Sequence, residues 1–289
     1  MPESPHLSAI FPELYKKPNP IIEPNSPLIV TGSLLHLEEV QMLAIDGGME
    51  PRIDPNTKIR MYGAIGGLSV LSKVRMTNPK DYSKLLWTPC KEIPVWVGAV
   101  SYEDSLDELL GVVDLTRFGD AIVEKGNATA LLTLSEIIQL FRSGVIKSNL
   151  RVSEVGSVIF SISSDADLLD ALKLMFEKRI RRVFLESQKQ RSRPCYLSSR
   201  SIIRFLFSPQ RLEIAKQNPE EWAQAKVRDL QFRESKVIFD GKTINQAAQE
   251  LGNSVDDCLV CEESQKVVTR WDLVMKPWKS REYFFGWGS

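Results

Sequence analysis

A short pattern at a strand–helix junction occurs four times in this chain, and it limits the folds that the chain can adopt. Residues 267–274 read VVTRWDLV, and residues 131–138, 196–203 and 75–82 read LLTLSEII, YLSSRSII and RMTNPKDY. In each segment an apolar strand end meets a Ser or Thr, and a polar residue follows three positions later, where a helix is expected to begin. Four copies of one junction predict a repeat protein that binds something.

The hydroxyl anchors of the four junctions are Thr77, Thr133, Ser198 and Thr269, which are 56, 65 and 71 residues apart. The segments around them predict units with the order strand, helix, strand, strand, helix, and therefore an α/β fold class made of α+β repeats. One such unit is too small to bury its own apolar face. We therefore expect the four units to pack as two tandem pairs.

The carboxyl-terminal half shows this order most clearly. The third unit has expected strands at 158–161, 182–185 and 195–197, a helix capped by Ser164 or Asp165, and a helix at 201–207. The fourth has expected strands at 236–239, 258–261 and 266–268, a helix capped by Thr243, and a helix at 270–275. A connecting helix is expected between these two units.

The amino-terminal half repeats the order with weaker signals. In the second unit the expected strands are 92–101, 121–124 and 129–132, and the expected helices are 105–118 and 135–142. In the first unit the expected strands are 28–31, 58–64 and 68–76, and the expected helices are 37–45 and 79–87. The predicted organisation is an extension (1–24), a degenerate repeat (25–87), repeats at 88–146 and 149–208, a linker helix (209–225), a repeat at 226–279 and an aromatic tail (280–289).

Composition excludes several classes of protein. The 289 residues are 43% apolar and 26% charged, and 37 Lys and Arg balance 37 Asp and Glu, so no overall field favours nucleic acid or a membrane surface. No segment is long and apolar enough to span a membrane, and the amino terminus does not have the order of a secretory signal. The four cysteines are too few and too scattered for a disulfide framework, which predicts a cytoplasmic protein.

Catalytic and metal sites are not expected. The two histidines, His6 and His36, are not near a nucleophile, and the glycine-rich run GAIGG lacks the Lys of a phosphate loop. Cys258 and Cys261 are three apart in an expected strand, so they should face opposite sides and could hardly share a metal ion. We therefore expect no enzyme activity, no bound metal and no prosthetic group.

Two segments resemble a known family. The run SVIFSISSDADLLDALKLMFEKRIRRVFL (157–185) is similar to the first half of a CBS domain, the module named after cystathionine β-synthase, and VVTRWDLVMKP (267–277) is similar to its closing strand and helix. Residues 151–278 resemble the family closely, 88–146 moderately and 25–87 only in element order. Four such units resemble archaeal stand-alone CBS proteins and the gamma subunit of AMP-activated protein kinase. The resemblance implies clefts that bind an adenine nucleotide (AMP, ADP or ATP).

The fourth junction has the groups that such a ligand needs. At a helix start, the Thr269 hydroxyl and free backbone amides can face a phosphate, and Asp272 can accept hydrogen bonds from both ribose hydroxyls. These are also the roles that the family resemblance implies for the two residues. Val237 and Ile238, with Val267 beside them, could wall the adenine. The competing interpretation is that Thr269 and Asp272 form an ordinary helix cap.

The other three junctions are weaker. For Thr133 and Glu136 a capping box is the better interpretation. Ser198 and Ser201 could bind phosphate, but without an acid they would hold a ribose weakly. In the first junction Lys80 stands where an acceptor is needed, so that site is expected to be empty. By resemblance to the kinase gamma subunit, Arg181 and Arg182 are the phosphate candidates, with a solvated helix end as the alternative. Asp256 and Asp257 would repel phosphate at the matching place in the fourth repeat.

The sequence therefore predicts a non-catalytic, energy-sensing regulatory protein that binds a nucleotide best between the third and fourth repeats. Binding would shift the packing of the pairs, which a protein partner would read; a homodimer is also compatible with the sequence. The alternative is nucleic-acid binding, because nine Lys or Arg stand against one Glu between Lys178 and Arg204. Backbone binding should weaken steeply with salt. The aromatic segment 277–287 should either pack onto the protein or form a docking patch.

Overall fold

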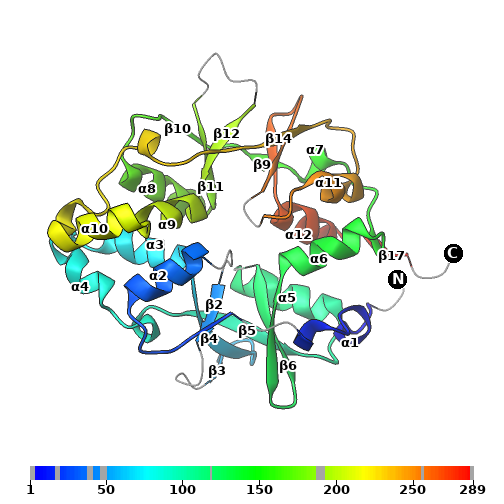
Figure 1. Cartoon of the computed structure of the whole chain (residues 1–289). Helices are drawn as coiled ribbons and strands as arrows, with labels where there is room; N and C mark the ends of the chain where they lie inside the picture. Colours follow the sequence, from blue (N-terminus) through cyan, green and yellow to red (C-terminus); the bar gives the residue numbers. More distant parts are fainter. Residues whose placement is uncertain are drawn as a thin grey trace.

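The computed structural model describes residues 4–16, 20–37, 42–45, 51–117, 119–186, 193–254 and 257–286. Sheets lie at the top and the bottom of the molecule in Figure 1, and helices from both halves of the chain pack between them. The fold is the mixed α/β repeat fold that the sequence predicts, with the four repeats arranged as two tandem pairs.

The first pair follows a short amino-terminal segment with helices α1 (Leu7–Ile10) and η1 (Leu14–Lys16). The first repeat contains β1 (Ile21–Ile22), α2 (Leu28–Leu37), β2 (Met42–Ile45), β3 (Arg52–Ile53), β4 (Arg60–Gly66) and α3 (Gly67–Met76), and η2 (Pro79–Asp81), α4 (Tyr82–Leu86) and η3 (Cys90–Glu92) follow it. The second repeat contains β5 (Val95–Ser101), α5 (Leu106–Thr116), β6 (Asp120–Lys125), β7 (Ala128–Thr133) and α6 (Leu134–Arg142).

The second pair begins after β8 (Ile146–Lys147) and α7 (Val152–Val155). The third repeat contains β9 (Ser157–Val158), β10 (Ser161–Ile162), α8 (Leu168–Lys178), β11 (Arg182–Leu185), β12 (Cys195–Ser198) and α9 (Ser199–Leu206), and is followed by α10 (Pro209–Gln217) and η4 (Pro219–Glu221). The fourth contains η5 (Val227–Asp229), β13 (Arg233–Glu234), β14 (Lys236–Ile238), α11 (Ile244–Glu250), β15 (Leu259–Cys261), β16 (Lys266–Val268), α12 (Arg270–Ser280) and β17 (Phe284–Phe285).

The sheets connect the repeats within each pair. In the first pair one sheet has the order β1-β2-β4-β5-β6-β7, with β3 also paired to β4. In the second pair the repeats exchange strands: β9 of the third repeat joins the sheet β14-β15-β16-β9, and β13 of the fourth joins β10-β11-β12-β13. The predicted single strand at 158–161 is therefore wrong, because the chain crosses there from one sheet to the other.

The helices connect the two pairs. One core joins helices of the first and third repeats and includes Leu71, Leu172 and Ile203, and another joins the second and fourth repeats and includes Ile137 and Leu273. In the first of these cores the buried Trp222 packs edge-on against Tyr82 and Phe207, with ring centroids 5.5 Å apart in both pairs. Apolar burial in these two cores thus holds the two tandem pairs together.

The first repeat differs most from the sequence prediction. The expected strand at 28–31 is part of helix α2, the expected strand at 68–76 is helix α3, and the expected helix at 37–45 contains strand β2, with 38–41 outside the described residues. Tertiary packing outweighs local preference here, since α3 buries Val70, Leu71 and Val74 on one face. Thr77 therefore stands at the end of α3, and the true counterpart of the other anchors is Gly66, the residue before α3.

Smaller differences concern helix ends. Helix α8 begins after Asp167 rather than at Ser164 or Asp165, because a turn from Ser163 to Ala166 delays it. The last helix continues through Pro277 to Ser280 instead of ending at 275. The linker contains α10 and η4 rather than one continuous helix. The prediction of a Thr243 cap on α11 is confirmed by the hydrogen bond from the Gln246 amide.

The aromatic tail packs back onto the protein. Trp278 Nε1 donates to the Asp107 carboxylate at 3.0 Å, Arg281 pairs with the same carboxylate at 3.2 Å, and the Tyr283 hydroxyl also donates to it. Strand β17 pairs with β8. The described residues therefore support the interpretation that this segment packs onto the protein. Its contacts with Asp107 attach the end of the fourth repeat to the first turn of α5 in the second repeat.

Candidate functional site

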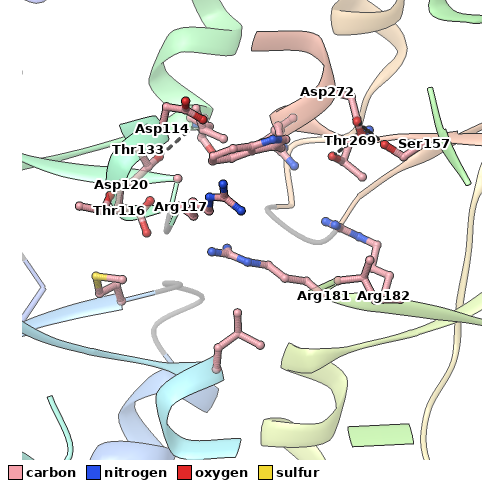
Figure 2. Close-up of a pocket in the computed structure, with 18 of the residues that line it drawn as sticks. Asp114, Thr116, Arg117, Asp120, Thr133, Ser157, Arg181, Arg182, Thr269 and Asp272 are labelled. Atoms are coloured by element: carbon pink, nitrogen blue, oxygen red, sulfur yellow. Dashed lines mark hydrogen bonds between the residues drawn. The ribbon is translucent and has the colours of Figure 1, made fainter. Parts of the chain in front are cut away.

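A cavity of about 1200 Å³ lies where the four repeats meet. Its lining includes Leu68 near the start of α3, Thr133 at the start of α6, Thr269 at the start of α12, and residues of the segment between α8 and β11. Phe11 and its neighbours in the amino-terminal segment complete the wall. Figure 2 shows Asp114, Asp120 and Thr133 on one side of the open space and Ser157, Thr269 and Asp272 on the other.

The structure brings Thr269 and Asp272 to this cavity, but their polar atoms already bind each other. The backbone amide and the hydroxyl of Thr269 donate to Asp272 Oδ2 at 2.9 and 2.7 Å, which is the geometry of a helix cap. Ser157 Oγ donates to Oδ1 at 2.7 Å, and Lys276 Nζ lies 3.3 Å from the same oxygen. Asp272 is only 3% exposed. A ribose could therefore use this carboxylate only by exchanging one of these contacts.

The apolar wall beside Thr269 comes from a different segment than predicted. Val237 is 43% exposed and Ile238 is buried in the core, and neither lines the cavity. The reason is the sheet order, in which β9 and not β14 lies next to β16. Val158, Ile159 and Phe160 therefore take this place and line the cavity together with Val267.

The third junction does not reach the central cavity. Ser198 and Ser201 are both buried, their hydroxyl oxygens are 3.1 Å apart, and the Ser201 amide donates to Ser198 Oγ at 3.0 Å. Neither residue lines the central cavity or the smaller one of about 50 Å³ beside it. These hydroxyls cap α9 inside the protein, and phosphate binding by Ser198 and Ser201 stays a prediction.

The second junction forms the predicted capping box. The Thr133 amide donates to Glu136 Oε2 at 3.0 Å, its hydroxyl donates to the same oxygen, and the Ser135 amide donates to Thr133 Oγ1 at 3.1 Å. Both Thr133 and Glu136 nevertheless line the central cavity. The cap fixes their orientation while leaving the helix start next to the open space.

Arginines from two repeats face the cavity. The predicted residues Arg181 and Arg182 line it, and so does Arg117, which the sequence analysis missed. Figure 2 shows Arg117, Arg181 and Arg182 extending toward one open region. Arg117 and Arg179 each follow the first long helix of their repeat in a left-handed conformation, with φ of 59° and 55°. Aligning these two helix ends would have indicated Arg117 as the partner of the predicted basic cluster.

The position opposite each helix start differs among the repeats. Met42 is paired with Gly66 in the first repeat, Asp120 with Thr133 in the second and Arg182 with Ser198 in the third. In the fourth repeat, the pairing of Leu259 with Val268 places Cys258 opposite Thr269. The same backbone place thus holds an apolar, an acidic, a basic and a thiol side chain, so the four sites cannot be chemically equivalent.

Acidic residues gather on the second-repeat side. Asp114 is ion-paired with Lys279 at 2.6 Å, and Asp120 is 1% exposed at the start of β6. Burial raises the pKa of Asp120 to about 7; the charge of Arg181 acts to lower that pKa and the charge of Glu136 to raise it. In the fourth repeat, Asp257 pairs with Arg233 at 3.0 Å and does not line the cavity, while Asp256 lies outside the described residues.

The basic run from Lys178 to Arg204 is divided by the fold. Lys178, Arg179, Arg181 and Arg182 line the cavity, Arg200 is buried beside the smaller cavity, and Arg193 is exposed elsewhere. The loop residues 189 and 191 lie outside the described part of the chain. The described members of the run therefore do not form one continuous surface, and nucleic-acid binding stays a prediction.

Cys258 and Cys261 pack into different apolar clusters, which confirms that they face opposite sides of β15. Within the described ranges, no three His, Cys, Asp or Glu side chains are grouped so that they could hold a metal ion. None of the described helices has the length and apolar character needed to cross a membrane.

Four strand–helix repeats around one cavity give the chain a fold similar to that of tandem CBS-domain structures. The structure is similar over 93% of this chain and 98% of the other to a protein from Methanocaldococcus jannaschii, a proposed archaeal homologue of g-AMPK, with a TM-score of 0.73 and 14% identity. Partial similarities include a conserved protein from Pyrococcus horikoshii (61% of this chain, 77% of that chain, 14% identity, TM-score 0.43). Another is a CBS domain protein from Pyrobaculum aerophilum complexed with AMP (43% of this chain, 86% of that chain, 15% identity, TM-score 0.33). No family model and no curated protein matches the sequence.

Proposed function

We propose that this protein is a non-catalytic regulatory protein that binds an adenine nucleotide in the central cavity. One observation carries the proposal: Arg117, Arg181 and Arg182, from two different repeats, face one cavity that also has an apolar wall. Guanidinium groups bind phosphate with paired, charge-assisted hydrogen bonds. The volume of about 1200 Å³ exceeds what one small ligand needs.

The ligand would lie across the junction of the third and fourth repeats. Its phosphate would contact Arg181 and Arg182, and its base would pack against the segment 158–160. Its ribose would approach Asp272 by replacing the contact of that carboxylate with Lys276 or Ser157. The polar groups and the apolar wall stand side by side in the lining of the cavity, and this supports the assignment.

A regulatory role follows from where the cavity lies. Because its walls belong to both tandem pairs, a ligand that contacts Arg117 and Arg181 together favours one relative placement of the pairs over others. A protein partner could read that placement. The similarity in fold to a proposed archaeal homologue of g-AMPK supports such a role.

Calorimetric titration with AMP and with ATP tests the proposal. We expect the wild type to bind at least one of them at sub-millimolar concentration and Arg181→Gln to bind at least tenfold more weakly, since a charge-assisted hydrogen bond contributes about 1.5–3 kcal/mol. Arg193→Gln is the matched control, because Arg193 belongs to the same basic run but does not line the cavity. No heat with either nucleotide, or equal losses in both variants, would contradict the proposal.

The same titration with Asp272→Asn tests the ribose contact. This substitution keeps the shape of the side chain and one carbonyl acceptor, so the cap on α12 should survive better than with alanine. We expect AMP to bind more weakly to Asp272→Asn than to wild type, while inorganic phosphate binds equally to both. Unchanged AMP affinity would remove Asp272 from the site without affecting the arginines.

A further inference from the structure

Asp120 is a buried acid in the wall of the central cavity. It is 1% exposed, and within the described part of the chain neither of its carboxylate oxygens has a hydrogen-bond partner. It is the first residue of β6 and lines both the central cavity and the smaller cavity of about 50 Å³. Buried polar groups are nearly always paired, so an unpaired carboxyl at a cavity wall indicates a place for an external partner.

The charged groups around Asp120 come from several elements. On the nearest elements they are Asp114 of α5, Arg117 after α5, Glu136 of α6, Arg181 and Arg182 at the start of β11, and Arg200 of α9. The central cavity is also lined by Glu13, Lys178, Arg179, Arg270, Asp272 and Lys279. Among them, the charges of Arg181 and Glu136 act most strongly on Asp120, in opposite directions. A phosphate that binds beside Arg181 therefore also comes close to this carboxyl.

We propose that Asp120 is a specificity-determining residue: a phosphate group binds beside Arg181 only together with a proton on Asp120. The neutral carboxyl donates a hydrogen bond to a phosphate oxygen, whereas the ionised carboxylate would face that oxygen with a like charge and no donor. Above about pH 7, where the free carboxyl has lost its proton, the ligand and one proton enter and leave together. This inference rests on the proposed function and adds to it that protonation sets the affinity of the site.

The pKa of Asp120 is already raised in the free protein, and a bound phosphate should raise it further. Burial and the charge of Glu136 raise the pKa of Asp120, and Arg181 is the cation that opposes them. A phosphate bound to Arg181 offsets that positive charge, so the pKa of Asp120 rises further in the complex. The result is uptake of a proton on binding near neutral pH.

The other repeats indicate why this effect should be local. The place of Asp120 is occupied by Arg182 in the third repeat and by Met42 in the first. An arginine there attracts phosphate at any physiological pH, and a methionine has no charge to titrate. Of the first three repeats, only the second would therefore couple phosphate binding to a proton.

The experiment measures AMP dissociation constants by calorimetry between pH 6 and 8.5 for wild type and Asp120→Asn. The asparagine copies the neutral acid, including its ability to donate, and does not titrate. We expect the dissociation constant of wild type, divided by that of the variant, to increase with pH above about 7. The increase should approach a factor of ten for each pH unit. Using this ratio cancels the titration of the ligand, since phosphate monoesters have a second pKa of about 6.

Proton uptake gives a second measurement. Titrations in two buffers with different enthalpies of ionisation should show that wild type takes up more protons than Asp120→Asn, with a difference that approaches one near pH 8.5. Asp114→Asn is the matched control, because Asp114 lines the same cavity but is already ion-paired with Lys279 at 2.6 Å. That variant should keep the pH dependence of the wild type.

The outcomes separate this inference from the function on which it rests. Binding with a constant ratio and equal proton uptake would overturn the role of Asp120 and leave the nucleotide site intact. Affinity that increases with pH and requires Mg²⁺ would also overturn it, because the carboxylate would then act in its ionised form. Absence of AMP and ATP binding at every pH, in wild type and variant, would contradict the proposed function itself.

Discussion

The two walls of the central cavity have the same backbone arrangement and opposite chemistry. On the second-repeat wall, Asp120 is paired across the sheet with Thr133; on the third-repeat wall, Arg182 is paired with Ser198 at the matching place. The first wall has a buried acid and a helix start that reaches the cavity. The second has the larger share of the arginines and a helix start that is buried.

This difference shows how a repeat protein can make one asymmetric site from equivalent parts. The strand-to-helix junction fixes where a side chain points, and the residue type at that place decides what it attracts. In the proposed site, charge alone would draw a phosphate to the third-repeat wall. The second-repeat wall would accept it only with a proton on Asp120.

The largest expected effect is the loss of the basic wall. The double substitution Arg181→Gln with Arg182→Gln removes two guanidinium groups from the cavity, so we expect AMP affinity to fall about 100-fold or more. Glu136→Gln on the opposite wall should change affinity by less than about threefold, since that side chain is engaged in a helix cap. Calorimetric dissociation constants at pH 7 measure both, and equal losses would contradict the asymmetry.

The second prediction concerns stability and the acid of the other wall. The pKa of Asp120 is raised from 3.8 to about 7 in the folded protein, so between these values the folded chain holds a proton that the unfolded chain has lost. The stabilisation is therefore fully present below pH 3.8 and is lost as pH rises through about 7, by about 4 kcal/mol at most.

Denaturant unfolding of wild type and Asp120→Asn at pH 5 and pH 8 checks this sign. The free energy of unfolding of wild type, relative to that of the variant, should decrease as pH rises. Burying the asparagine amide changes the free energy of unfolding of the variant by the same amount at both pH values. The change of the free energy with pH is therefore compared, and not its absolute value. A relative increase with pH would mean that Asp120 is ionised in the folded protein, and the proton-coupled binding would lose its basis.

The third prediction compares the two helix caps that face the cavity. Asp272 is buried and accepts hydrogen bonds from Thr269 and Ser157, whereas Glu136 caps α6 at a less buried place. We expect Asp272→Ala to destabilise the protein by about 2–3 kcal/mol, because it leaves buried donors unpaired. Glu136→Ala should cost about 1 kcal/mol or less. Thermal melts at pH 7 without ligand measure the difference, and equal shifts would show that the two junctions are energetically alike.

The sequence predicted most of the fold where hydrophobic period and capping residues agree. Strand β11 and the Thr243 cap of α11 are found where they were expected. The first repeat could not be predicted in this way. Helix α2 contains Gly32, whose Cα faces the Phe207 ring so closely that an added Cβ would lie 2.3 Å from it. Only the packing of the first repeat against the third explains this glycine, and a local pattern cannot show that packing.

The candidate site was predictable in part for a similar reason. Arg181 and Arg182 stand in a conspicuous basic run, and Thr269 and Asp272 stand in a recognisable junction, so their residue types alone indicated them. Arg117 is a single cation at a helix end, and Asp120 is a single acid at a strand start. What makes both notable is the cavity that tertiary packing places beside them. Local sequence likewise could not show the strand exchange, which places Val158 of β9, and not Val237 of β14, next to β16.

The smallest expected effect is that of salt, and it also distinguishes a nucleotide site from nucleic-acid binding. A ligand held by Arg181 and Arg182 in a partly enclosed cavity is screened less than one on an open surface, so AMP affinity should fall less than about threefold between 50 and 200 mM NaCl. Binding of a duplex along the basic run would fall by orders of magnitude over the same range, in proportion to the phosphates contacted. Fluorescence anisotropy with a labelled 20-base-pair duplex and calorimetry with AMP measure the two dependences. Tight duplex binding that is lost with salt and with Arg193→Gln, next to weak AMP binding, would reverse the preference between the two ligands.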